Sequence, residues 1–249
     1  MESRNKARQD RIMYTREQFA KMIDHSLIRP DALKQDFLRL ADDAARCHFA
    51  SVVVLPCWVG TVARALGDSD IKVGAAVSFP FGGDSRAAKA FAIRNAISNG
   101  ASEIDAVFNI SRYKSGDLEG VRRDLSEMVD AVRTSSSGTL SNSNRRVLLK
   151  VIIETCYLSD PEIERASKLV RDSGADFVQT STGTGFSGAT VENIRLIRRS
   201  VGADSVGIKA AGGIRKIQDA IELLDAGANR IGTSSGVALF DQYESMSSA

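Results

Sequence analysis

The chain has 249 residues, of which 43% are hydrophobic, so it can bury a large core within one domain. Its 33 basic and 31 acidic residues leave a formal net charge of +2, and this near balance argues against binding to nucleic acid. Residues 1–11 lack the apolar core of a secretion signal, and no later stretch is apolar enough to span a bilayer. We therefore expect a cytoplasmic protein with neither a nucleic-acid nor a membrane partner.

Short apolar, β-branched runs alternate along the chain with segments of helical period. The runs predicted to be strands cover residues 22–27, 51–55, 72–78, 103–108, 147–153, 177–180, 205–210 and 230–232. The predicted helices cover residues 36–47, 85–99, 118–134, 161–173, 190–200 and 217–226. This order predicts the α/β class, with a closed (β/α)8 TIM barrel as the first interpretation and an open doubly wound sheet as the alternative.

The domain plan follows from this pattern. We expect residues 15–249 to form a single barrel domain and residues 1–14 to be a flexible N-terminal extension. Asp160 before Pro161 is predicted to cap one helix, and Thr190 is predicted to cap another. The serine-rich residues 135–144 are predicted to be a loop.

Side chains alternate between the lumen and the helix layer of a barrel, so residues two apart share a face. One face would carry Asp105, Lys150, Gln179 and Lys209 from four consecutive strands. Lys209 has small, apolar neighbours, which is unusual for lysine. Burial and the nearby charge of Lys150 would favour its neutral, nucleophilic amine, but a purely stabilising pair with Asp105 is the alternative. Asp105 could likewise transfer protons or be a structural acid that balances two lysines.

Glycine and serine follow three of the predicted strands. The candidates for a phosphate site are Thr182 and Gly183 after strand six, Gly212 and Gly213 after strand seven, and Ser234 and Ser235 after strand eight. Backbone amides next to glycine can approach an anion closely, and the last loops of such barrels commonly bind phosphate. Tight turns without a ligand are the alternative. A metal site is rejected, since the two histidines and three cysteines have no ligand spacing.

Seven blocks resemble deoxyribose-phosphate aldolases and occur in family order. They are residues 24–27, 77–82, 100–105, 149–155, 175–183, 207–215 and 232–236. The resemblance implies a barrel that cleaves 2-deoxyribose 5-phosphate to glyceraldehyde 3-phosphate and acetaldehyde through a Schiff base, without a cofactor. It implies that Asp105 moves protons through a water, that Lys209 assists the Schiff-base lysine and Lys150 lines the site, and that Asp24 bonds near a substrate hydroxyl.

Gln179 stands where the family has its Schiff-base lysine. An amide nitrogen cannot form an imine, because its lone pair is delocalised into the carbonyl. Three hypotheses stay open: an impaired aldolase, a sugar-phosphate-binding protein of the same fold, and an active enzyme into which the glutamine was introduced. The family's frequent C-terminal tyrosine is absent, and Tyr243 is not assigned its role. The sequence leaves a homodimer open.

Overall fold

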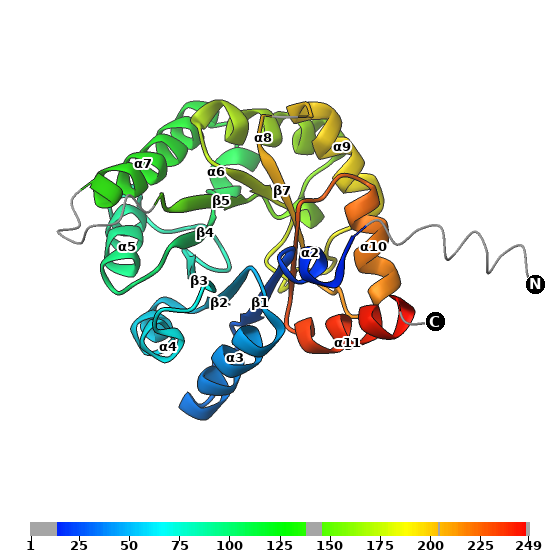
Figure 1. The fold of residues 1–249 in the computed structure, drawn as a ribbon. Coiled ribbons are helices and arrows are strands. Elements are labelled where there is room, and N and C mark those ends of the chain that lie inside the picture. The colour runs from blue at the N-terminus through cyan, green and yellow to red at the C-terminus, as the bar shows by residue number, and fades with distance from the viewer. Residues whose placement is uncertain (1–13, 138–145, 204, 248–249) are drawn as a thin grey trace, which may run out of the picture.

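The computed structural model describes residues 14–137, 146–203 and 205–247 (Figure 1). Eight parallel strands pair in chain order, and β8 closes the ring on β1. The strands are β1 Ile23–Leu27, β2 Ser51–Val54, β3 Lys72–Val77, β4 Glu103–Val107, β5 Leu148–Ile152, β6 Phe177–Gln179, β7 Gly207–Ala211 and β8 Arg230–Thr233. This closed barrel confirms the predicted fold and excludes the open sheet. Of the predicted N-terminal extension, residues 1–13 lie outside the described residues and only Tyr14 is described.

All six predicted helices are present. The helices are α2 Arg16–Ala20, α3 Lys34–Cys47, α4 Val59–Leu66, α5 Arg86–Ser98, α6 Ile110–Lys114, α7 Leu118–Ser137, α8 Asp160–Ser173, α9 Val191–Val201, α10 Ile217–Asp225 and α11 Gly236–Ser247. Pattern analysis missed α2, α4, α6 and α11. The first three are too short to show a clear period, and α11 begins inside the glycine and serine run after β8.

Two local predictions were wrong. The N-cap of α8 is Ser159, not Asp160, because the Ser159 amide donates to the carboxylate of Glu162 at 2.8 Å in a capping box. In addition, α7 continues to Ser137, so the first part of the predicted serine-rich loop is helical, and residues 138–145 lie outside the described residues. The cap at Thr190 is confirmed, since its hydroxyl accepts from the amide of Asn193 at 3.1 Å.

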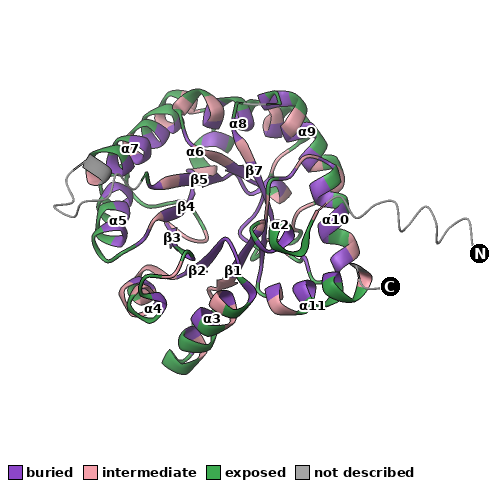
Figure 2. Cartoon of the chain, in the orientation of Figure 1, coloured by how far each residue is buried: buried purple, intermediate pink, exposed green. Residues whose placement is uncertain are grey.

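The alternation of side chains along the strands divides the core in two. On β4, Ile104 and Ala106 pack with the helices, whereas Glu103, Asp105 and Val107 point into the barrel. Figure 2 shows the same division on the helices, which turn buried faces inward and exposed faces outward. The two-residue period therefore places the charged residues of the strands in the lumen.

At the amino end of the barrel, α2 packs against the outer helix α11. The ring of Tyr243 on α11 stacks on Phe19 of α2 at 4.3 Å, and its hydroxyl donates to the carbonyl of Tyr14 at 2.6 Å. Both partners precede β1, so Tyr243 lies at the end of the barrel opposite the carboxyl ends of the strands. Within the described ranges, no helix is both long and apolar enough to cross a membrane.

Candidate active site

A pocket of about 380 Å³ opens at the carboxyl ends of the strands. Among the predicted site residues, its lining includes Asp105, Gln179, Thr182, Gly183, Lys209, Gly212, Gly213 and Ser234. Arg29 and Arg215 also line it, and sequence analysis did not single them out. The pocket thus joins the predicted polar lumen to the predicted phosphate loops.

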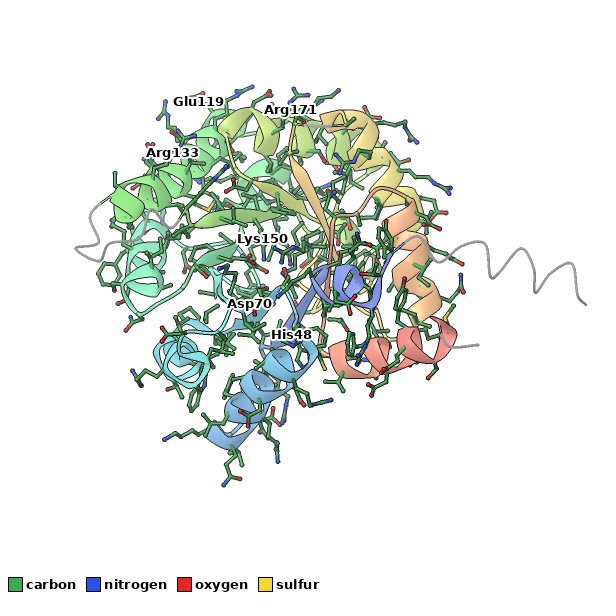
Figure 3. The ribbon with its side chains drawn as sticks, viewed as in Figure 1. His48, Asp70, Glu119, Arg133, Lys150 and Arg171 are labelled. Atoms are coloured by element: carbon green, nitrogen blue, oxygen red, sulfur yellow. The ribbon has the colours of Figure 1, made fainter. Side chains whose placement is uncertain are left out.

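Six charged side chains meet in the lumen next to this pocket. Three are basic and three acidic: Lys150, Lys209 and Arg230, with Asp24, Glu103 and Asp105. The formal charge of the cluster is therefore zero. Figure 3 shows Lys150 inside the ring of strands, whereas Glu119, Arg133 and Arg171 lie on the outer helices. The structure brings Asp105, Lys150 and Lys209 together as predicted and adds Asp24, although the chemical roles of all four stay predictions.

Each lysine of the cluster contacts more than one carboxylate. The ammonium of Lys150 lies 2.7 Å from Asp24 and 3.2 Å from Asp105, and it also pairs with Glu103. That of Lys209 lies 2.8 Å from Asp24 and 2.5 Å from Asp105. The pair with Asp105 that a stabilising role requires is therefore present. Buried charges are tolerated only when they are compensated in this way.

The electrostatics of Asp24 and Lys150 are set by competition between burial and pairing. Burial disfavours the charged form of Asp24, but Lys150, Lys209 and Arg230 outweigh it and hold the pKa of Asp24 well below its usual range. Burial likewise disfavours the charged form of Lys150, but the surrounding carboxylates outweigh it and raise the pKa of Lys150. Both groups are charged at neutral pH.

Glu103 and Arg230 were missed by sequence analysis. Arg230 begins β8 and pairs with Asp24 and, at 3.3 Å, with Glu103. The signal was available, because Glu103 shares the lumen face of Asp105 by its two-residue spacing. A glycine also shapes the cluster. A Cβ on Gly232 would lie 2.7 Å from Cε of Lys209, so the lack of a side chain on Gly232 makes room for the lysine.

Gln179 lies at the wall of the pocket between two strands of the site. Its register partners are Ile152 on β5 and Lys209 on β7. The residue is only 4% exposed, and its Nε2 donates to the carbonyl of Ser181 at 3.2 Å. Its Oε1 is buried without a hydrogen-bond partner among the described residues. A side-chain amide therefore occupies the position where imine chemistry would need an amine.

The residues of the predicted phosphate loops differ in whether their backbone and side chains are open to a ligand. Gly213 has a φ of 77° with no atom within 4 Å of a built Cβ, so its backbone is open to a ligand. Gly212 is packed tightly, since a Cβ there would lie 2.9 Å from Gly188. Ser234 is exposed in the pocket two residues before the start of α11, whose first amides favour an anion. Ser235 is not part of the lining, and its amide donates to Thr233 at 2.9 Å.

Thr182 is held by a residue that sequence analysis missed. Its amide lies 3.1 Å from the carboxylate of Glu154, and its hydroxyl donates to the same group. Both donors of Thr182 are thus engaged, so it shapes the loop instead of offering a donor to an anion. Glu154 follows β5 with a φ of 51°, and burial raises the pKa of its carboxyl. No motif signalled this contact, because it depends on the left-handed backbone at Glu154.

No group of three or more metal-ligating side chains occurs among residues 14–137, 146–203 and 205–247. The polar groups that line the pocket include the amine of Lys209, the carboxylate of Asp105, the amide of Gln179 and the guanidinium groups of Arg29 and Arg215.

The loops after β7 and β8 are predicted to bind phosphate. Replacing Ser234 by aspartate would put a like charge where the anion lies, so inorganic phosphate should bind about 10-fold more weakly, roughly 1.4 kcal/mol. Isothermal titration calorimetry would measure this change. Ser111→Asp is the matched control, since Ser111 is exposed in the first turn of another helix and does not line the pocket. Equal phosphate affinity in all three proteins would contradict the assignment.

Comparison with known proteins agrees with this fold. A family model described as DeoC/LacD family aldolase matches residues 19–242. Deoxyribose-phosphate aldolase from Thermoanaerobacter pseudethanolicus is 42% identical over 227 residues, which cover 91% of this chain and 97% of that protein. The one from Carboxydothermus hydrogenoformans is 44% identical over 227 residues, with coverage of 91% and 96%. The solved structure of deoxyribose phosphate aldolase from Aeropyrum pernix, described as tetrameric, superposes with a TM-score of 0.81 at 28% identity and covers 97% of both chains.

The barrel and its relatives define a lyase scaffold of the aldolase type. The family suggested by the seven sequence blocks is confirmed. This chain belongs to the DeoC/LacD family of aldolases.

Proposed function

We propose that the pocket binds 2-deoxyribose 5-phosphate and the aldehydes formed from it, and that Gln179 greatly reduces aldol cleavage. The observation that carries this proposal is the position of Gln179, whose amide lines the pocket together with Asp105 and Lys209. The scaffold keeps the acid and the assisting amine, and it has an amide where the imine would form.

The proposed roles follow from the contacts of each side chain. Asp105 lines the pocket and can exchange protons with a bound ligand through a water. Lys209 lines the same pocket and is the candidate for any remaining imine. Lys150 and Asp24 do not line the pocket, so they act by orienting Lys209 and Asp105 through ion pairs.

The phosphate group of the ligand would lie near Gly213, Ser234 and Arg215. These groups line one part of the pocket, and they combine an open glycine, a helix start and a cation. The test of the whole proposal is an assay of 2-deoxyribose 5-phosphate cleavage by this protein and by Gln179→Lys. Equal activity of the two proteins would contradict it.

A second candidate is a sugar-phosphate-binding protein without lyase activity. The observation that favours it is the engagement of both lumen lysines by carboxylates, with Lys209 paired to Asp24 and Asp105. Such a protein would bind the sugar phosphate but gain nothing from Gln179→Lys. The same assay therefore separates the two candidates.

We predict that any Schiff base formed by this chain uses Lys209. Treatment with acetaldehyde and borohydride, followed by peptide mass mapping, should place the reduced adduct on Lys209, because Gln179 cannot react and Lys209 lines the pocket. In Gln179→Lys the adduct should move to the introduced lysine. Modification confined to exposed lysines such as Lys34 or Lys168 would contradict the prediction.

The remaining proposals concern the protein as a whole. Residues 15–249 are proposed to act as one aldolase domain in the cytoplasm, with a small phosphorylated sugar or aldehyde as the ligand and no nucleic-acid partner. A homodimer stays a prediction, to be tested by the molar mass in solution.

A further inference from the structure

Two buried oxygens in the site have no hydrogen-bond donor. Among the described residues, Oε1 of Gln179 and Oδ1 of Asp105 are both buried and lack a hydrogen-bond partner. The ammonium of Lys150 lies 3.2 Å from Oδ1 of Asp105, but their geometry forms no hydrogen bond. Gln179 and Asp105 line the same pocket. Two residues of the pocket lining therefore carry a buried acceptor that lacks a donor and that a bound ligand could supply with one.

The orientation of the Gln179 amide determines which atom stays available. Its Nε2 is used by the carbonyl of Ser181, which leaves Oε1 as the free end. The last torsion of a glutamine side chain is broad, so small rotations can turn this oxygen toward a bound molecule. A buried acceptor left without a donor is destabilising, and a ligand that donates to it removes that cost.

The chemistry of carbon-1 of the ligand determines whether it can donate. An aldehyde oxygen only accepts hydrogen bonds, so it could not bond to Oε1 of Gln179, and the two oxygens would repel each other. A hydroxyl group on the same carbon donates, as in a sugar alcohol or a ring-closed sugar. Lysine at this position would be a donor and a nucleophile, whereas glutamine leaves an acceptor free.

We propose that Gln179 makes the pocket selective for phosphorylated polyols and ring-closed sugars that carry a hydroxyl at carbon-1, and that Gln179 Oε1 accepts a hydrogen bond from this hydroxyl. The selectivity rests on the proposed function, because the phosphate is taken to lie at the loops after β7 and β8. The selectivity adds to the proposed function that the free aldehyde is the form of the ligand that binds more weakly. Sites built to bond a hydroxyl reject analogues that lack it, because their polar groups are left unpaired.

Two unreactive probes that differ by one oxygen atom test this inference. They are 2-deoxyribitol 5-phosphate, which has a carbon-1 hydroxyl, and 1,2-dideoxyribitol 5-phosphate, which has a methyl group instead. Calorimetry should find that the unaltered protein binds the first about 10-fold more tightly than the second. In Gln179→Met, which keeps the length of the side chain without an acceptor, this ratio should fall below about 3. Arg215→Ala, at the phosphate end, should weaken both probes equally and leave the ratio unchanged.

Each outcome has a separate meaning. Equal binding of both probes by the unaltered protein would overturn the inference while supporting a sugar-phosphate pocket, and this comparison does not depend on the folding of any variant. A ratio that persists in a folded Gln179→Met would overturn the inference, because another residue would then bind the hydroxyl. If neither probe nor inorganic phosphate bound, the proposed function would fail, and the selectivity with it.

Discussion

Gln179→Lys should raise the rate of 2-deoxyribose 5-phosphate cleavage by at least about 10³-fold, which corresponds to roughly 4 kcal/mol in the barrier. In the unaltered chain, an imine could form only at a misplaced amine such as Lys209, and misplacement by 1 Å can cost about 10²-fold in rate. Complete loss of a nucleophile often costs more. The measurement is the steady-state release of acetaldehyde, with kcat and KM determined separately. The gain should appear mainly in kcat, because the loops after β7 and β8 are unaltered.

Gln179→Arg is the matched control for this gain. Arginine supplies a positive charge of similar reach, but its guanidinium stays protonated and forms no imine under these conditions. We expect no increase in cleavage from this variant. A comparable gain with arginine would mean that charge, and not a nucleophile, was missing at position 179. No gain with lysine would favour the binding protein over the aldolase.

Lys150→Met should lower the free energy of unfolding by about 3–5 kcal/mol, because it removes one partner from a buried ionic cluster. Lys150 is fully buried against Asp24, Glu103 and Asp105, so three carboxylates would be left with two cations. Equilibrium unfolding in guanidinium chloride would measure the loss. Lys168→Met is the control, since Lys168 is exposed on α8 and should change stability by less than about 0.5 kcal/mol.

The loss should depend on pH in a defined direction. The pKa of Asp24 is depressed in the folded protein, so its stabilising contribution is full above the unfolded value near 3.9 and is lost as pH falls through the folded value. Without Lys150, Asp24 would take up a proton more readily, and this would remove the excess negative charge of the cluster. The difference in unfolding free energy between the unaltered protein and Lys150→Met should therefore shrink below about pH 4. A difference that stayed constant or grew in acid would contradict this account.

The sequence allowed the barrel to be predicted because strands and helices have different periods. The same period of two placed Asp105, Lys150, Gln179 and Lys209 on one lumen face, and the register of β4 to β7 agrees with it. Pattern analysis failed for elements too short to repeat a pattern, such as α6. It also failed for the cap of α8, where the capping box of Ser159 and Glu162 forms in place of a cap by Asp160.

The candidate site was harder to predict where it depends on contacts between distant segments. Arg230 pairs with Asp24, 206 positions away, and no local pattern encodes such a partner. Glu154, which accepts a hydrogen bond from Thr182, has a left-handed backbone conformation that the residue type itself does not suggest. Thr182 and Ser235 matched the composition of a phosphate loop, but internal hydrogen bonds occupy the donors of Thr182 and the amide of Ser235.

The hydrogen bond between Tyr243 and Tyr14 has a practical consequence for handling the protein. It holds the first described residue and the last helix side by side at the amino end of the barrel, opposite the mouth of the pocket. A sensor chip or resin attached next to Tyr14, or through an exposed residue near the end of α11, would therefore hold the molecule with its pocket facing the solution. Protein immobilised at either of these two positions should bind small ligands with the same affinity.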